Sequence, residues 1–191
     1  MTHQSPIAPG ISYYQASVTH RPAYPELPGN TEADAVIVGG GFTGLQAAYH
    51  QAKAGRNVVL IDGARFGDGA SGRNGGQLGT GQRSWPEEHE SQLGRERATH
   101  LFRIAERAKA HLQDFAAAHG IDADYRPGQI SAAHKTSYVA DYKAHADIVR
   151  DRYDYPHIRF LEREELAEKL GTTRYHGGII DSGTGHINPL K

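Results

Sequence analysis

The feature that most constrains this chain is a glycine-rich turn that directly follows a short apolar run. Residues 35–38, Ala-Val-Ile-Val, lead into Gly39-Gly40-Gly41-Phe42-Thr43-Gly44, which fits the pattern G-x-G-x-x-G. A continuous apolar run that ends in glycine predicts a strand buried on both faces. The glycine pattern is specific only where it joins a strand to a helix, so the residues that follow decide what it means.

The residues after the turn predict a helix and a second strand. Residues 43–54 have helical periodicity, Gly55 ends the helix, and residues 57–61 are again mostly apolar. The positions expected to share one face of the helix are Leu45, Ala48, Tyr49 and Ala52. Strand, helix and strand together predict a parallel βαβ unit with a right-handed crossover.

This context predicts a dinucleotide-binding site. Gly39 permits the tight turn, Gly41 lets a pyrophosphate approach the backbone, and Gly44 lets the helix lie close on the sheet. The N-terminus of the helix, at Phe42 and Thr43, presents N–H groups and a partial positive charge to the phosphates. Asp62 follows the second strand, where its carboxylate can accept hydrogen bonds from a ribose diol.

A second glycine-rich segment stands where a nicotinamide-binding domain would have its second helix. Residues 63–81 lack apolar periodicity and interleave glycine with polar side chains. The residues predicted to wrap an extended cofactor are Arg65, Ser71, Arg73, Asn74, Gly75 and Gly76. Arg73 supplies a planar cation suited to an anion or to a buried carboxylate. The segment favours FAD, while an NAD-dependent dehydrogenase and a solvated linker remain alternatives.

The flanking segments predict less specific structure. Residues 1–33 form an irregular leader, pinned to the surface by Tyr13 and Tyr14, with a partner-binding polyproline segment as the alternative. Its prolines are Pro6, Pro9, Pro22, Pro25 and Pro28. Later periodicity predicts helices over 92–119, 136–152 and 162–170, and strands over 158–161 and 176–181. Residues 122–133 predict a strand or a hairpin around Pro127 and Gly128. The apolar stripe expected to pack in the core along the first of these helices is Leu101, Ala105, Ala108, Leu112 and Phe115.

Composition excludes several function classes. A net charge of -1 argues against a nucleic-acid surface, and apolar runs of only four residues cannot span a membrane. The absence of cysteine excludes disulfides and thiolate chemistry and fits the cytoplasm. The 12 histidines are scattered without the spacing of a helical zinc site, so no metal is expected. Glu87, Glu88 and Glu90 are interpreted as a solvated acidic face. Asn188 and Pro189 resemble the start of a helix, which favours a chain that continues further.

The sequence resembles a known family. Its segments SYY at 12–14, ADAVIVGGGFTGLQAA at 33–48, VVLIDGARFGDGASGRNGGQ at 58–77 and GHINPLK at 185–191 are similar to the FAD-dependent amine and amino-acid oxidoreductases of the D-amino-acid oxidase superfamily. Within that superfamily the best match is to the gamma-glutamylputrescine oxidoreductase group. The resemblance extends over the whole chain but covers only the front portion of such an enzyme.

The resemblance implies an α/β fold in which a Rossmann-like, glutathione-reductase-like FAD unit is followed by the beginning of an α+β substrate domain. Residues 34–82 would carry the βαβ unit and the second loop, and residues 83–191 helices and first strands of both domains. FAD would be bound noncovalently, with its pyrophosphate on Gly39, Gly41 and Gly44. A small-molecule amine would be oxidised at its C–N bond, with O₂ reduced to H₂O₂. A noncatalytic, truncated nucleotide-binding module is the alternative from a different class, and neither a catalytic base nor the oligomeric state follows from the sequence.

Overall fold

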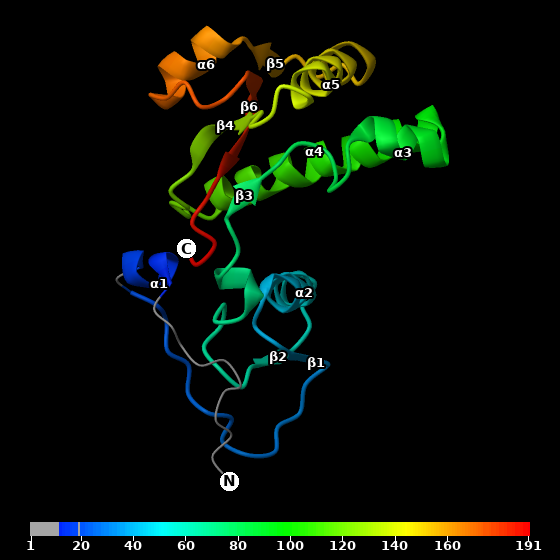
Figure 1. Cartoon of the computed structure of the whole chain (residues 1–191). Coiled ribbons are helices and arrows are strands. Elements are labelled where there is room, and N and C mark those ends of the chain that lie inside the picture. Colours follow the sequence, from blue (N-terminus) through cyan, green and yellow to red (C-terminus); the bar gives the residue numbers. More distant parts are fainter. Residues whose placement is uncertain (1–11, 19) are drawn as a thin grey trace. The chain divides into compact units, whose positions relative to one another are not determined.

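The computed structural model describes residues 12–18 and 20–191 and divides the chain into two compact units. The first unit contains the residues up to Gly76 together with residues 188–191, and the second contains residues 77–187 (Figure 1). Pro6 and Pro9 of the predicted leader lie outside the described residues. Both units mix helices and strands, so the predicted α/β class is confirmed.

The first unit contains the predicted βαβ arrangement. Strand β1 (Ala35–Val38), helix α2 (Phe42–Lys53) and strand β2 (Val58–Ile61) follow one another, and α2 packs against both strands. The two strands pair in parallel, with Ala35 opposite Val58 and Val38 opposite Ile61. The turn between β1 and α2 therefore lies at the carboxyl end of a parallel sheet, where open α/β sheets bind ligands.

The prediction that residues 35–38 are buried on both faces was wrong. Burial alternates along β1: Ile37 lies beneath Gly44 of α2, whereas Val36 and Val38 are 59% and 79% exposed. The reason is that the sheet of this unit has two strands and α2 covers one of its faces. An apolar run alone does not distinguish a covered face from an open one.

The leader is partly helical rather than wholly irregular. Helix α1 (Tyr13–Ser17) begins at Ser12, whose hydroxyl accepts a hydrogen bond from the Gln15 N–H at 3.1 Å. Residues 20–34 form no further helix or strand. Tyr13 is 80% exposed, and Tyr24 makes the ring contact that holds the leader, against Phe66 at 5.0 Å between centroids. The leader thus has a contact through a tyrosine outside the predicted pair, while Tyr14 of that pair is half-buried.

Residues 188–191 form a turn rather than a helix. Asn188 nevertheless has the geometry of a helix cap, because its Oδ1 accepts a hydrogen bond from the Leu190 N–H at 3.1 Å. Its amide donates to Ser17 Oγ at 3.0 Å, which ties this turn to α1 within the first unit.

The second unit is built on an antiparallel sheet around one long strand. Strand β6 (Gly178–His186) pairs along one edge with β4 (Arg126–Ala132). Its other edge pairs with β3 (Gln77–Leu78) at one end and β5 (Ile158–Leu161) at the other. The register of β4 shifts between Pro127 and Gln129, so the Pro-Gly pair makes an irregularity within a strand, not a hairpin turn. The strand predicted over 176–181 is β6, which extends further than expected, to His186.

Helices α3 (Pro86–Leu93), α4 (Arg95–Ala118), α5 (Tyr138–Arg152) and α6 (Arg163–Leu170) complete the second unit. The single helix predicted over 92–119 is in fact α4, separated from the unpredicted α3 by Gly94 at φ 80°. Because α3 packs beside α4, the buried face of α4 centres on Ala98 and Phe102 rather than on Leu101 and Ala108. The other two predicted helices are confirmed as α5 and α6.

The hydrophobic core lies between the helices and the sheet of the second unit. Its buried members are Ala98, Phe102, Ala146, Val149, Tyr153, Tyr155, Ile158 and Ile179. Within residues 12–18 and 20–191, no helix combines the length and the apolar character needed to cross a membrane.

Candidate dinucleotide site

The turn after β1 has the backbone geometry that its glycines predict. Gly39 adopts φ 106°, a conformation that other residues rarely adopt, and its N–H donates to the Ile61 carbonyl at 2.8 Å. A Cβ at Gly44 would collide with the carbonyl oxygen of Gly39 and lie 3.3 Å from Ile37 Cγ2. The close approach of α2 to β1 is therefore confirmed, and it requires glycine at position 44.

The N-terminus of α2 is open to an anion. Gly41 occupies the N-cap position without a side chain to cap the helix, and the first turn contains no acidic residue. Ser71 Oγ accepts a hydrogen bond from the Phe42 N–H at 3.0 Å, while the side chain of Thr43 is exposed. The first N–H groups of a helix have no intrahelical acceptor, so this end carries a partial positive charge.

The structure brings the two glycine-rich segments together. The Gly67 N–H donates to the Gly40 carbonyl at 2.9 Å, and the ring of Phe66 lies so close to Gly40 that a Cβ there would collide with it. A Cβ at Gly41 would lie 2.8 Å from Ser71 Oγ. Both segments thus border the same N-terminal end of α2, where the missing side chains of Gly40 and Gly41 make room for Phe66 and Ser71. The predicted binding of a diphosphate at this end of the helix stays a prediction.

Asp62 lies beside this turn. Its Oδ2 accepts a hydrogen bond from the Gly40 N–H at 2.6 Å and its Oδ1 one from the Ala64 N–H at 2.9 Å. These bonds fix the orientation of an exposed carboxylate, each of whose oxygens can accept a second hydrogen bond. The predicted contact with a ribose diol fits this geometry and stays a prediction.

The other residues predicted in the second loop have different surroundings. Asn74 shapes the loop itself: its amide donates to the Ser71 carbonyl at 2.7 Å and its Oδ1 accepts from the Gly76 N–H at 2.7 Å. Gly75 is exposed and Gly76 buried. Arg73 is exposed, and its guanidinium has no partner within the described part of the chain. It is therefore available to an anion.

A clamp between the leader and the second loop was not predicted. Arg21 Nη1 pairs with Asp68 Oδ1 at 2.7 Å, with side chains only 8% and 19% exposed, and Nη2 donates to the Phe66 carbonyl. Arg65 donates to the Arg21 carbonyl at 3.4 Å, and its predicted contact with a cofactor stays a prediction. A single arginine in a proline-rich leader carries no periodic signal, so the sequence offered no means of finding this clamp.

The interpretation of Glu87, Glu88 and Glu90 as a solvated face was wrong for two of the three. Glu87 Oε1 lies 2.7 Å from His145 Nδ1. Glu90 Oε2 lies 3.1 Å from Arg152 and accepts from the Tyr153 hydroxyl at 3.2 Å, and the bond to Arg152 lowers the Glu90 pKa. The reason is that these residues belong to α3, whose position against α5 the sequence did not reveal.

Comparison with known proteins identifies the class to which this site belongs. Residues 34–191 match the family described as FAD dependent oxidoreductase, known as DAO. The chain belongs to this family of FAD-dependent oxidoreductases. FAD is therefore the dinucleotide, which removes the alternative of an NAD-dependent dehydrogenase. Among the described residues, no group of three or more His, Asp or Glu side chains could hold a metal ion.

Particular relatives narrow the comparison. The chain is 54% identical over 191 residues to the probable oxidoreductase OrdL of Rhizobium meliloti, covering all of this chain and 45% of that protein. It is 32% identical over 180 residues to gamma-glutamylputrescine oxidoreductase of Escherichia coli, covering 94% of this chain and 42% of that protein. The chain thus spans less than half the length of these curated relatives.

The fold is also found in solved structures. L-amino acid deaminase from Proteus myxofaciens, in complex with anthranilate, superposes with a TM-score of 0.65 at 20% sequence identity. The match covers 91% of this chain and 36% of that one. At such identity the likeness establishes a shared fold.

Proposed function

We propose that the protein carrying this chain is an FAD-dependent oxidoreductase that oxidises the C–N bond of a small-molecule amine. The observation that carries the proposal is the open N-terminus of α2, bordered by two glycine-rich segments that contact each other through Gly40, Gly67 and Ser71. The relatives support the amine class, because one of them is named for gamma-glutamylputrescine and the solved structure is an amino acid deaminase.

In the proposed complex the chain's own groups hold the cofactor without a covalent bond. Gly39, Gly41 and Gly44 leave the backbone clear for the pyrophosphate, and the positive end of α2 offsets its charge. Asp62 accepts from the adenosine ribose. The side of the cofactor that carries the flavin would be lined by Ser71, Arg73, Asn74, Gly75 and Gly76. Bound FAD supplies the two-electron oxidation that no side chain can perform.

The overall reaction that we propose consumes an amine, O₂ and water. The amine loses two electrons and two protons to give an imine, water hydrolyses the imine to a carbonyl compound and ammonia or a smaller amine, and O₂ is reduced to H₂O₂. The substrate resembles gamma-glutamylputrescine in carrying an amine on a flexible carbon chain. The protein contributes binding, orientation and electrostatics.

Purification of the protein tests this proposal directly. We expect a bound yellow flavin that acid precipitation releases intact as FAD, as noncovalent binding requires. We also expect anaerobic addition of an amine substrate to bleach the flavin band and readmission of air to restore it with formation of H₂O₂. A preparation that never retains flavin, or a flavin that amines never bleach, would contradict the proposal. Retention by a longer chain but not by residues 1–191 would indicate that this segment alone is a noncatalytic module.

A further inference from the structure

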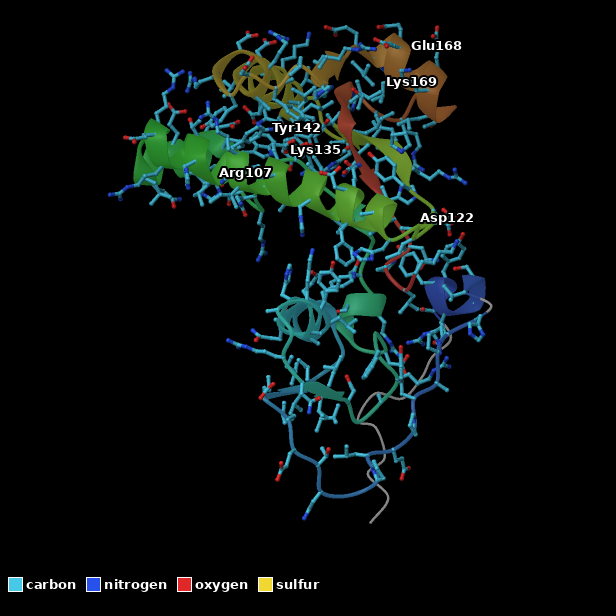
Figure 2. The ribbon with its side chains drawn as sticks, turned by 180° about the vertical axis from the view of Figure 1, so that it is seen from behind. Arg107, Asp122, Lys135, Tyr142, Glu168 and Lys169 are labelled. Atoms are coloured by element: carbon cyan, nitrogen blue, oxygen red, sulfur yellow. The ribbon has the colours of Figure 1, made fainter. Side chains whose placement is uncertain are left out.

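A cavity of about 380 Å³ lies within the second unit, and all of its lining residues fall between Gln77 and Thr184. Its volume is in the range of sites that hold small molecules. The aromatic part of its wall consists of Trp85, Phe102 and Tyr142, and its polar part includes Asp181 and His145. Figure 2 labels Tyr142 on α5. The first glycine-rich segment contributes nothing to this cavity, and the second contributes only Gln77, Gly79 and Thr80 near its end.

Asp181 is a carboxylate buried in the wall of this cavity without a cation to balance it. Asp181 is 8% exposed. Its Oδ1 accepts hydrogen bonds from the Tyr155 hydroxyl at 2.8 Å and from the Gly183 N–H at 2.9 Å. Within the described residues Oδ2 has no hydrogen-bond partner and no Lys, Arg or His forms an ion pair with Asp181. A buried charge without a counter-charge is costly, so this position favours a bound cation.

The ammonium of Lys109, which reaches the same Tyr155 hydroxyl as Asp181, is bound to other groups. Lys109 Nζ pairs with Glu106 at 2.8 Å and donates to Thr80 Oγ1 at 3.1 Å and to the Tyr155 hydroxyl at 3.3 Å. Burial raises the Tyr155 pKa well above its ordinary value, so this hydroxyl remains protonated and donates to Asp181. Asp181 is thereby held in one orientation while its charge stays unpaired.

His145 can supply a second acceptor to the same cavity in one of its neutral tautomers. Its ring stacks on Trp85 at 4.1 Å between centroids and 15° between planes, and Nδ1 lies 2.7 Å from Glu87 Oε1. A neutral imidazole that donates from Nδ1 to Glu87 has its lone pair on Nε2, for which the described residues provide no donor. Glu87 Oε2 is itself buried without a hydrogen-bond partner, so a second carboxylate lies close behind this wall.

We propose that this cavity binds the ammonium group of a small organic amine, with Asp181 Oδ2 as counter-charge and His145 Nε2 as hydrogen-bond acceptor. The faces of Trp85 and Tyr142 cover the carbon chain and attract its positive end. A metal ion does not fit, because the described residues contain no cluster of three ligands. The proposal rests on the proposed function only for the choice of an amine as the ligand; the site itself is separate from the predicted FAD-binding residues.

Calorimetric titration with butylamine tests the site in the FAD-loaded protein whose flavin has first been reduced, so that no turnover occurs. Asp181→Asn should weaken butylamine binding about ten- to a hundredfold, because it removes a charged hydrogen-bond acceptor. His145→Gln should weaken it about tenfold. The matched controls Asp114→Asn and His100→Gln change exposed residues of α4 and should leave the affinity unchanged. Butyrate, which lacks the cation, should not bind in the cavity.

A measurement on the unmodified protein covers the case in which a cavity variant fails to fold. With the histidine rings labelled with ¹⁵N, butylamine should shift the His145 Nε2 resonance and leave that of His100 unchanged. Equal affinity of Asp181→Asn and the unmodified protein, or an unmoved His145 resonance at saturating butylamine, would overturn the proposal. Neither result depends on whether amines bleach the flavin, so failure of this site and failure of the proposed function are distinguishable.

Discussion

The two units of this chain use their residues in opposite ways. In the first unit, the candidate site is made mainly by backbone groups and by glycines that lack side chains. Every fully buried apolar side chain of the described residues lies in the second unit. In the second, side chains such as Asp181 and His145 carry the chemistry on a packed core. A glycine pattern is therefore visible in the sequence, whereas a site made of buried side chains appears only once the helices are placed.

The largest effect is expected where the backbone of the first unit has no room. Gly44→Ala would place a Cβ against the Gly39 carbonyl oxygen, and backbone atoms cannot move aside as a flexible side chain does. The substitution should therefore lower the free energy of unfolding by about 3 kcal/mol and abolish retention of FAD. Gly63→Ala is the matched control, since a Cβ at Gly63 meets nothing within 4 Å. Urea unfolding and the flavin-to-protein ratio measure both effects.

If the Gly44→Ala protein retained flavin as the Gly63→Ala protein does, the close approach of α2 to β1 would not be what the site depends on. The distinction between a backbone-made site and a side-chain-made site would then fail for the first unit.

The second prediction concerns a side-chain contact that holds the second glycine-rich loop of the first unit to the leader. Arg21→Met breaks the ion pair with Asp68, whose side chain is only 19% exposed. A carboxylate that stays largely buried without its cation should lower the free energy of unfolding by about 2 kcal/mol. Since Arg21 also holds the Phe66 carbonyl, the second loop should lose its position and FAD affinity should fall. Urea unfolding and flavin titration provide the measurements.

Asp68→Asn in the Arg21→Met background supplies the control for this pair. It removes the charge left unpaired, so the double variant should regain part of the lost stability but not the lost FAD affinity. Recovery of neither stability nor affinity would show that Arg21 acts through packing alone.

The same contrast explains how far the sequence could predict the fold. The βαβ unit followed from residues 35–61, because apolar runs, helical periodicity and glycine turns are local signals. Helix α3 escaped prediction because its eight residues are largely polar and carry no apolar stripe. Once α3 was missed, the buried face of α4 was misplaced and Glu87 was interpreted as solvated.

The candidate site divides along the same line. Both glycine-rich segments were predicted to bind one extended cofactor, and the structure has them in contact at Gly40 and Gly67. The Arg21–Asp68 pair and the His145–Glu87 pair were not, because their partners are far apart in sequence and neither motif nor spacing connects them. Composition cannot show that a carboxylate such as Asp181 is buried without a cation.

The third prediction tests a buried hydroxyl in the second unit. The single proton of the Tyr153 hydroxyl is shared between two acceptors, the Pro86 carbonyl at 3.1 Å and Glu90 at 3.2 Å, so Tyr153→Phe should cost about 1 kcal/mol. Burial and Glu90 raise the Tyr153 pKa to about 12, above that of the unfolded chain. A raised pKa stabilises the fold below the unfolded value of about 10, and this stability is lost as the pH rises through about 12.

Urea midpoints at about pH 9 and about pH 11 measure that dependence. The unmodified protein should lose stability between the two, and Tyr153→Phe should lose less. Part of the loss should persist in the variant, because burial also raises the Tyr155 pKa. Identical pH dependence in both proteins would show that the Tyr153 hydroxyl is hydrated rather than enclosed between α3 and α5.

The smallest effect is expected on the surface of the second unit, where a side-chain contact is well formed but solvated. Arg159 donates two hydrogen bonds to Glu165, at 2.9 and 2.5 Å, and these bonds hold the Glu165 pKa below its ordinary value. Both side chains are at least 40% exposed, however, so water and salt screen the pair. Arg159→Gln should leave the urea midpoint unchanged at neutral pH. A loss as large as that of Tyr153→Phe would mean that contact geometry, rather than burial, determines which side chains of the second unit contribute to its stability.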